Sequence, residues 1–219
     1  MARLNHSGST DLLRRELFPI GFAGEVMLLI LETWRVFSLR REVRRETRIT
    51  AVFREALITA YVEAGRTWFI SLEDPITDPT FGTELGRNDL RFYPPNHHGQ
   101  TIFFTLECKR LRVTTASGFR DLVDKYVDDG VLRFVNGQYS AGLPCGGMIG
   151  YVMDNETSKA LISVLAEIEL KAVSLKLRAR DGIRTPSRLF PGYETSADTF
   201  HDRADGPFEL HHVLVGVSA

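Results

Sequence analysis

The sequence that decides the fold is RNDLRFYPPNHHGQTIFFTLECKRL, which spans residues 87–111. Residues 89–93 form a short strand-like run, and residues 101–113 form a longer one that begins with β-branched and aromatic side chains. Such runs are typical of strands. Four residues that favour turns stand between them: Pro94, Pro95, Asn96 and Gly99. This stretch therefore predicts an antiparallel β-hairpin.

Three charged residues of this hairpin are candidates for a shared site. Asp89 begins the first strand, and Glu107 and Lys109 lie toward the end of the second. Because alternate side chains of a strand share a face, Glu107 and Lys109 point the same way and Cys108 points the other way. Antiparallel pairing brings Asp89 beside Glu107. We therefore expect two carboxylates and one ammonium group on one side of a sheet.

This combination of charges predicts metal-assisted chemistry on a phosphate ester. Two neighbouring carboxylates repel each other, and a divalent cation removes that conflict. Oxygen ligands suit Mg²⁺, and Mn²⁺ is an expected substitute. A bound cation holds a phosphate and lowers the pKa of a bound water, and Lys109 would orient that water or stabilise the developing charge. The expected reaction is hydrolysis of a phosphodiester bond.

Helices are predicted on both sides of the hairpin in the chain. Apolar residues recur at helical spacing before it: Ile49, Val52, Phe53, Ala56, Leu57, Ala60, Tyr61 and Ala64. This amphipathic pattern ends at Gly65. A second helical pattern runs over residues 119–127 and is expected to end near Gly130, a plausible C-cap.

The rest of the chain alternates in the same way. Residues 148–153 form a continuous apolar run typical of a buried strand, residues 161–168 predict a third helix, and residues 208–217 predict a last strand. Residues 73–86 and 174–206 are expected to be irregular. Strands alternating with helices predict an α/β core rather than a helical bundle.

The residues Asn88-Asp89 and Glu107-Cys108-Lys109 resemble the signature of the PD-(D/E)xK nuclease superfamily, which has the restriction-endonuclease-like fold. In that signature an acid begins one strand, and Asp or Glu, any residue and Lys follow on the next. The usual proline before the acid is Asn88 here. The resemblance implies a central mixed β-sheet flanked by helices, dependence on Mg²⁺ and cleavage of nucleic acid. It also implies a glutamate from the first core helix in the metal site, for which Glu55 is the expected residue.

A downstream string extends the resemblance to small restriction-like proteins of bacterial and phage-defence loci. Its residues are Lys125-Tyr126, Asp129-Gly130, Arg133-Phe134, Gly137, Tyr139 and Gly147-Met148-Ile149-Gly150-Tyr151-Val152. The resemblance implies DNA as the favoured substrate and a homodimer or a partner subunit of a defence complex. The expected domains are a helical N-terminal extension over residues 1–47 and a restriction-endonuclease-like domain over residues 48–219.

The expected site residues fall into three sets. Asp89, Glu107 and Lys109 are the catalytic residues, Asp89, Glu107 and Glu55 are the metal ligands, and Arg110, Arg112 and Arg133 bind nucleic acid. Two longer stretches, residues 35–54 and 171–188, are also rich in basic residues. Each fits a solvated surface as well as a phosphate contact, although a nucleic-acid groove explains the two together somewhat better.

Composition limits the other classes of protein. The chain has 219 residues, 43% of them hydrophobic, and a net charge of −1, which excludes wholesale disorder and a global basic field. Its two cysteines cannot build a disulfide framework, so a cytoplasmic location is expected. No apolar run is long enough to predict a membrane span. The histidines, among them His97, His98, His201 and the His211-His212 pair, lack zinc-site spacing, and a structural role is expected for them.

Two other functions are compatible with the same residues. A binding or assembly protein could keep the nuclease-like scaffold and hold nucleic acid or a partner without turnover. A small metal-dependent hydrolase could act on another phosphate ester. Metal binding that needs Asp89 and Glu107 separates the first alternative from a nuclease. Strongly salt-dependent binding to a polynucleotide is expected of a nuclease and not of a hydrolase that acts on a small phosphate ester.

Overall fold

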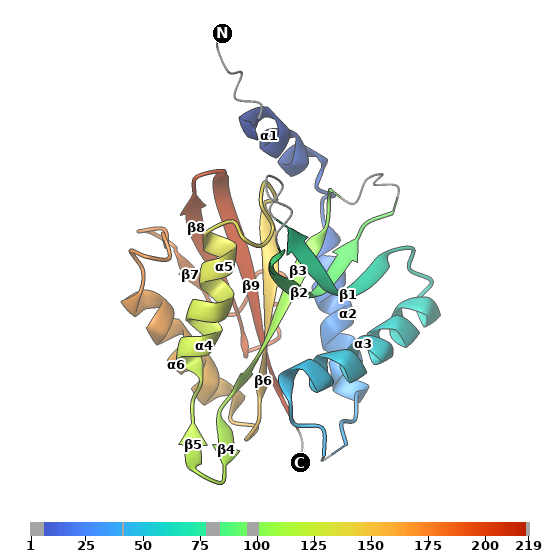
Figure 1. The fold of residues 1–219 in the computed structure, drawn as a ribbon, viewed down its shortest axis with the longest axis vertical. Coiled ribbons are helices and arrows are strands. Elements are labelled where there is room, and N and C mark those ends of the chain that lie inside the picture. Colours follow the sequence, from blue (N-terminus) through green and yellow to red (C-terminus); the bar gives the residue numbers. More distant parts are fainter. Residues whose placement is uncertain (1–6, 41, 78–83, 96–100, 218–219) are drawn as a thin grey trace.

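A computed structural model describes residues 7–40, 42–77, 84–95 and 101–217 (Figure 1). Within these residues seven strands form one mixed sheet in the order β1-β2-β3-β6-β9-β8-β7. The strands are β1 (Phe69–Thr77), β2 (Glu84–Tyr93), β3 (Phe104–Leu111), β6 (Cys145–Val152), β7 (Ile183–Arg184), β8 (Ser196–Arg203) and β9 (Gly206–Gly216). The central strands β3, β6 and β9 are parallel, and the outer pairs are antiparallel.

Helices cover both faces of this sheet. The described helices are α1 (Ser7–Leu17), α2 (Phe22–Val36), α3 (Glu46–Glu63), α4 (Val123–Tyr126), the π-helical turn η1 (Val127–Val131), α5 (Leu132–Val135) and α6 (Thr157–Leu170). α2 and α3 lie against one face, and α4, η1, α5 and α6 lie against the other (Figure 1). A small hairpin of β4 (Val113–Thr115) and β5 (Gly118–Arg120) projects from the end of β3. The prediction of an α/β fold with a mixed central sheet is confirmed.

The central strand β6 shows why the sheet has two cores. All eight of its residues are buried, because helices cover the strand on both sides. Ile149 and Tyr151 belong to the core under α2 and α3, whereas Met148 and Val152 belong to the core under α4 to α6. Gly146 and Gly147, near the start of the strand, allow close packing. A Cβ on Gly146 would lie 2.5 Å from the Phe134 ring.

The N-terminal helices differ in how they join the domain. α2 lies in the first core, with Val26, Met27 and Ile30 fully buried against the sheet. The domain boundary expected at residue 47 therefore falls inside α3, and α2 shares its core with the sheet. α1 projects beyond the sheet (Figure 1), and Arg15 bonds it to the carbonyl oxygens of Asp205 and Pro207.

Within the described residues, no helix is long and apolar enough by itself to cross a membrane. The segments Asp11–Leu17 and Phe22–Val36 pass that test only as a pair, and they are bent by 62° with respect to each other.

The prediction of a loop over residues 73–86 is wrong for its described part. β1 continues to Thr77 and β2 already begins at Glu84, while residues 78–83 lie outside the described residues. The edge position of β1 explains the difference. An edge strand tolerates proline, and Pro75 is exposed and in register with Arg87.

The helix expected over residues 119–127 is also placed differently. Residues 118–120 form β5, and Phe119 is exposed. The helical segment begins at Val123 and continues through the π-helical turn to Val135, so Gly130 is not its C-cap. A Cβ on Gly130 would lie 2.5 Å from the Met148 Cε, so packing against β6 explains the glycine.

Residues 174–206, expected to be irregular, contain the buried strand β8. The prediction was wrong because polar residues normally indicate an exposed loop, whereas Asp198, Thr199 and His201 are all buried. These side chains hydrogen-bond to other protein groups, which allows a polar sequence to lie inside the sheet. The expected last strand and the expected third helix are confirmed as β9 and α6.

Candidate active site

The candidate site lies where β2 separates from β3. The two strands pair only from Leu90 to Phe92, against Phe104 to Leu106. The earlier part of β2 pairs with β1, and the later part of β3 pairs with β6. Asp89 stands at the point of separation, and its Oδ2 accepts a 2.7 Å hydrogen bond from the backbone nitrogen of Cys108. One carboxylate is thereby fixed at the open edge of β3.

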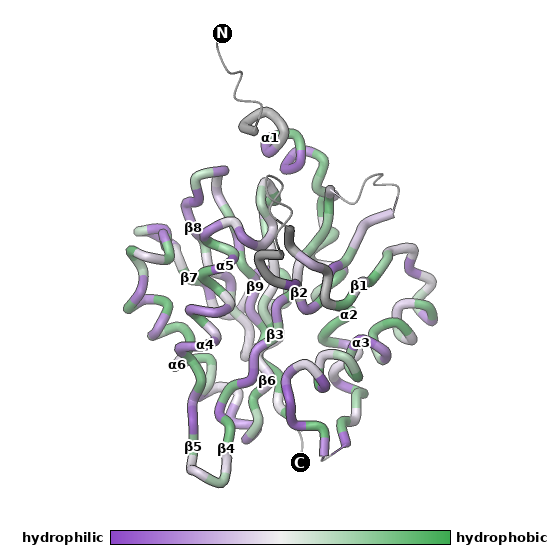
Figure 2. The backbone as a smooth tube through the Cα atoms, viewed as in Figure 1, coloured by the Kyte–Doolittle hydropathy of each residue, from purple (hydrophilic) through white to green (hydrophobic). Residues whose placement is uncertain are grey.

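The next residues of β3 build the site on one face of the sheet. The Lys109 Nζ donates to Glu107 Oε1 at 2.6 Å and to the Cys108 carbonyl oxygen at 3.1 Å. Cys108 itself lies in the core under α2 and α3. The predicted alternation of these three side chains is therefore confirmed. Figure 2 shows β3 changing from hydrophobic to hydrophilic in the middle of the sheet.

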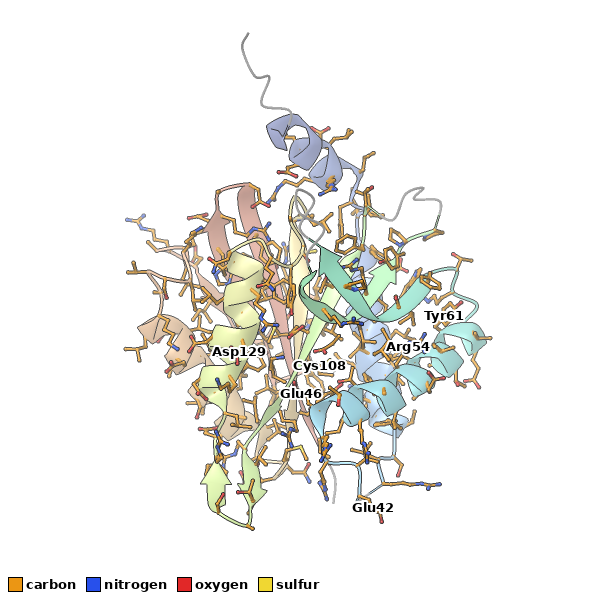
Figure 3. All side chains as sticks on the ribbon, viewed as in Figure 1. Glu42, Glu46, Arg54, Tyr61, Cys108 and Asp129 are labelled. Carbon is orange, nitrogen blue, oxygen red and sulfur yellow. The ribbon has the colours of Figure 1, made fainter. Side chains whose placement is uncertain are left out.

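The third carboxylate comes from the first turn of α3, and it is Glu46. Its Oε1 lies 3.5 Å from the Lys109 Nζ, and its Oε2 accepts a 2.8 Å hydrogen bond from the Arg110 backbone nitrogen. Figure 3 shows Glu46 at the start of α3, with Glu42 farther out on the loop that precedes the helix. Glu46 therefore connects this helix to β3.

The expectation that Glu55 supplies this carboxylate is corrected by its position on the same helix. Glu55 is exposed and forms an ion pair with Arg54 at 2.7 Å. It follows Glu46 by nine positions, which at about 100° each places it on the opposite side of the helix. The apolar pattern begins at Ile49, so Glu46 stood outside the predicted helix and was missed. α3 begins at Glu46, about one turn before Ile49, so extending the predicted helix by one turn would have included this glutamate.

Burial and neighbouring charges strongly perturb Glu107. Its residue is only 2% exposed, and burial, followed by the negative charge of Asp89, raises its pKa to about 8 despite Lys109. Burial lowers the pKa of Lys109, but Glu107, Glu46 and Asp89 outweigh it, and the net shift is upward. Lys109 is therefore held as an ammonium ion among carboxylates, whereas Glu107 gains a proton readily.

One oxygen of Glu107 makes the site suitable for a divalent cation. Glu107 Oε2 is buried and finds no hydrogen-bond partner within the described part of the chain. Leaving such an atom unsatisfied costs about 1–3 kcal/mol. A cation would satisfy this oxygen and relieve the repulsion between Glu107 and Asp89. Carboxylate oxygens are hard ligands, so the residues present fit Mg²⁺ or Mn²⁺.

The three arginines expected to bind nucleic acid have different surroundings. The Arg110 Nη1 donates to the carbonyl oxygen of Arg44 at 2.8 Å, and the Arg112 Nε donates to both carboxylate oxygens of Asp154. Arg133 lies on α5, and its Nη1 donates to the Tyr139 hydroxyl, which in turn donates to the carbonyl oxygen of Arg87, two residues before Asp89. Burial lowers the pKa of Arg133, but the hydrogen bond to Tyr139 and the charges of Tyr139 and Glu107 outweigh it.

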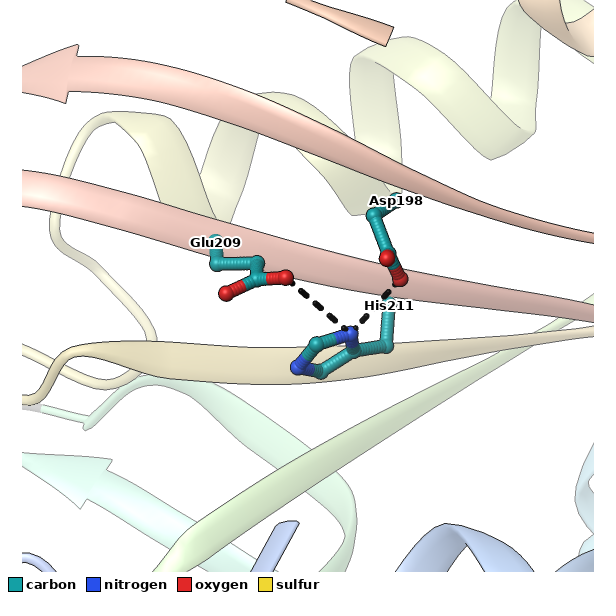
Figure 4. Close-up of side chains that lie close together, drawn as sticks. All are labelled: Asp198, Glu209 and His211. Atoms are coloured by element: carbon teal, nitrogen blue, oxygen red, sulfur yellow. Dashed lines mark hydrogen bonds and ion pairs between the residues drawn. The ribbon is translucent and has the colours of Figure 1, made fainter. Parts of the chain in front are cut away.

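A second polar cluster, Asp198, Glu209 and His211, lies in β8 and β9 (Figure 4). Asp198 accepts hydrogen bonds from the His211 Nδ1 at 2.8 Å, the Ser187 Oγ at 2.5 Å and the Arg188 backbone nitrogen at 2.8 Å. Burial raises the pKa of Asp198, but these hydrogen bonds outweigh it and leave the pKa low. They attach the segment before β8 to the sheet, so we assign the cluster a structural role.

The sheet register separates this cluster from the candidate site. Glu107 is in register with Met148, and Met148 with His212, so these three share a face, and His211 points to the other face. His212 bonds to Tyr126 and Thr199, and burial lowers its pKa to about 3. His211 and His212 thus point in opposite directions. His97 and His98 lie outside the described residues.

Comparison with known proteins adds no relative. No family model matches the chain, and it matches neither a curated protein nor a solved structure. The class of protein that the fold and site define is an α/β protein with a buried acid–lysine cluster where its mixed sheet divides.

Proposed function

We propose that the protein is a metal-dependent endonuclease that hydrolyses phosphodiester bonds. The observation that carries this proposal is the contact of the partly buried Lys109 ammonium with the buried Glu107, whose second carboxylate oxygen has no hydrogen-bond partner among the described residues. Asp89 and Glu46 flank this pair. An ammonium group and an unsatisfied buried carboxylate oxygen are the groups that metal-assisted attack on a phosphate needs.

The residues present have distinct roles in this proposal. Asp89 and Glu107 would hold the cation, with Glu46 as the third carboxylate beside Lys109. The bound cation supplies positive charge to the phosphate and lowers the pKa of a bound water. Lys109 has a raised pKa and keeps its proton, so it serves as a hydrogen-bond donor and positive charge rather than as a general base.

The state of Glu107 couples the site to pH. With a pKa of about 8, this carboxyl group is mostly protonated at neutral pH when no cation is present. Binding a cation requires the ionised form, so binding releases a proton and strengthens as the pH rises. We therefore expect cleavage to increase from pH 6 to pH 8 at limiting metal concentration.

The biological setting follows from the resemblance to PD-(D/E)xK proteins. DNA is the favoured substrate on that basis, and phage defence in the cytoplasm is the proposed setting. A homodimer, or a complex in which the chain is a partner subunit, is proposed for cutting both strands. These statements depend on the resemblance and are separable from the chemistry of the site.

The test is a cleavage assay with the purified chain. Plasmid, linear duplex, single-stranded DNA and RNA are incubated with Mg²⁺, Mn²⁺ or EDTA, beside the Lys109→Ala and Glu107→Ala variants. We expect metal-dependent cutting that both variants lose while remaining folded. The matched pair Glu46→Gln and Glu55→Gln should separate the two glutamates of α3, with a loss only for the first.

The alternatives are decided by the same preparations. No cutting, combined with calorimetry that shows no metal uptake dependent on Asp89 or Glu107, would contradict the nuclease and leave a binding or assembly protein. Hydrolysis of a small phosphate ester, without salt-dependent binding to any polynucleotide, would identify the other hydrolase.

A further inference from the structure

Tyr139 connects three parts of the chain beside the candidate site. Its hydroxyl accepts a 2.7 Å hydrogen bond from the Arg133 Nη1 and donates one of 3.0 Å to the carbonyl oxygen of Arg87. Arg133 belongs to α5, and Arg87 belongs to the part of β2 that has left β3. The hydroxyl thus joins α5 to the projecting β1–β2 hairpin across the opening of the sheet.

The surroundings of Tyr139 hold this hydroxyl in one place. The residue is 1% exposed, and its ring packs edge-on against Phe134 with the centroids 5.2 Å apart. The turn after α5 returns the chain to Arg133, because the backbone nitrogens of Gln138 and Tyr139 both donate to the Arg133 carbonyl oxygen. Gly137 allows this turn with a φ of 73°. Arg133 and Tyr139 are therefore fixed relative to each other by backbone and side-chain bonds.

Arg133 is fixed at one end and open at the other. Its guanidinium lies 5.7 Å from the centre of the Tyr139 ring. Among the described residues, Nε and Nη2 donate to no protein acceptor, and neither atom is a buried unsatisfied one. Tyr139 donates to the carbonyl oxygen of Arg87, two residues before Asp89 in the same strand, which places the pair near the acidic cluster. A guanidinium with open donors can bind two phosphate oxygens at once.

The charges of the site favour such a group. Glu107 and Glu46 both lie against the Lys109 ammonium, and Asp89 accepts a hydrogen bond from the Cys108 backbone nitrogen. A phosphate brings further negative charge, which grows on its oxygens as the bond is cleaved. The Arg112 guanidinium is paired with the Asp154 carboxylate and that of Arg110 donates to the Arg44 carbonyl oxygen, whereas Arg133 donates to a hydroxyl and has no carboxylate partner among the described residues.

We propose that Arg133 binds the phosphate that is cleaved at Asp89, Glu107 and Lys109, and that Tyr139 is the positioning residue that aims Arg133. The inference rests on the proposed nuclease function. It adds a phosphate-binding residue and a positioning residue. The hydrogen bond from Tyr139 to Arg87 then holds β1 and β2 beside the bound nucleic acid.

The kinetic test compares Arg133→Ala, Arg133→Lys, Tyr139→Phe and the double variant Tyr139→Phe/Arg133→Ala. The wild type must first show cutting that Lys109→Ala abolishes. We then expect Arg133→Ala to lower kcat by roughly 10²–10³-fold, as for loss of one donor to a developing charge. Arg133→Lys should recover only part of this, because an ammonium lacks the guanidinium fork.

Tyr139→Phe tests positioning separately. It should lower kcat by about tenfold, and the double variant should match Arg133→Ala alone, because Tyr139 acts through Arg133. A purely structural tyrosine would instead multiply the two losses. Tyr193→Phe is the matched control, since the Tyr193 hydroxyl donates to the Leu214 carbonyl oxygen, and its kcat should stay at the wild-type value. Thermal melting of each variant confirms folding.

A binding measurement provides a readout apart from turnover. In a Lys109→Ala background, the salt dependence of binding to a single-stranded DNA oligonucleotide should weaken by about 0.7 in its logarithmic slope when Arg133→Ala is added. Cutting within threefold of wild type and an unchanged slope would overturn the inference while leaving the nuclease standing. If the wild type does not cut at all, the proposed function fails, and an unchanged slope would still overturn the role of Arg133.

Discussion

Replacing Glu107 by glutamine should make the metal-free protein more stable at pH 8 and less sensitive to pH. Burial and the charge of Asp89 raise the pKa of Glu107 from 4.5 to about 8 in the folded chain. The folded state therefore binds this proton more tightly than the unfolded state does. Stability from this group is fully present below pH 4.5 and is lost as the pH rises through 8. Glutamine keeps the shape and has no proton to lose.

The structure sets the size of this effect. At 1.36 kcal/mol for each tenfold change, a pKa raised from 4.5 to about 8 corresponds to on the order of 4 kcal/mol lost by pH 8. The free energy of unfolding of a globular domain is about 5–15 kcal/mol, so this loss of stability is large. At roughly 2–4 °C for each kcal/mol in a chain of this length, the wild-type Tm should fall by about 8–16 °C between pH 5 and pH 8.

The assay is thermal unfolding in EDTA at several pH values from 5 to 9, with Glu107→Gln beside the wild type. The variant should lose most of the fall in Tm. Adding Mn²⁺ at about a hundred times its dissociation constant should return about 2.7 kcal/mol to the wild type at pH 8. The same addition should do nothing for the variant, because the amide is a poor ligand for the cation.

The reasoning fails if the wild type and Glu107→Gln show the same dependence of Tm on pH. That result would mean that Glu107 is ionised throughout and that Lys109 alone satisfies it. A return of stability by Mn²⁺ in both proteins would place the cation at another site.

Three further results are expected. Glu46→Gln should weaken metal binding by about tenfold or more in calorimetry, whereas Glu55→Gln on the opposite side of α3 should leave it unchanged. Gly146→Ala should cost about 1–3 kcal/mol in urea unfolding, because the new methyl group meets the buried Phe134 ring, and adding Phe134→Leu should recover part of this; no recovery would contradict the packing explanation. Asp198→Ala should cost about 1–3 kcal/mol because the buried donors of His211 and Ser187 lose their acceptor, with metal binding by the folded protein unchanged; loss of metal binding would contradict its structural role.

The parts of the fold that the sequence predicted share one property. β3 and β9 and the helices α3 and α6 each carry an apolar pattern whose period matches the element and whose residues reach a core. Glu107 and Lys109 were predicted on one face because alternation along a strand needs no information from the rest of the chain. The alternation of side chains along a single strand was therefore enough to predict that Glu107 and Lys109 share a face.

The missed features depend on contacts between distant residues. β8 is polar and buried, and only its hydrogen-bond partners show why it is a strand. Glu46 precedes the apolar pattern of its helix, and its role depends on how α3 packs against β3. Tyr139 stands in the downstream string, but its bond to the Arg87 carbonyl joins residues 52 positions apart. Such contacts follow from the tertiary fold rather than from periodicity.

The most direct test of the central claim is cleavage of DNA measured together with metal uptake in the same preparations of wild type, Lys109→Ala and Glu107→Ala. The proposed site predicts cutting that needs Mg²⁺ or Mn²⁺, uptake that is lost in Glu107→Ala, and no cutting by either variant. Cutting that survives in Lys109→Ala, or a folded wild type that neither cuts nor takes up metal, would contradict it.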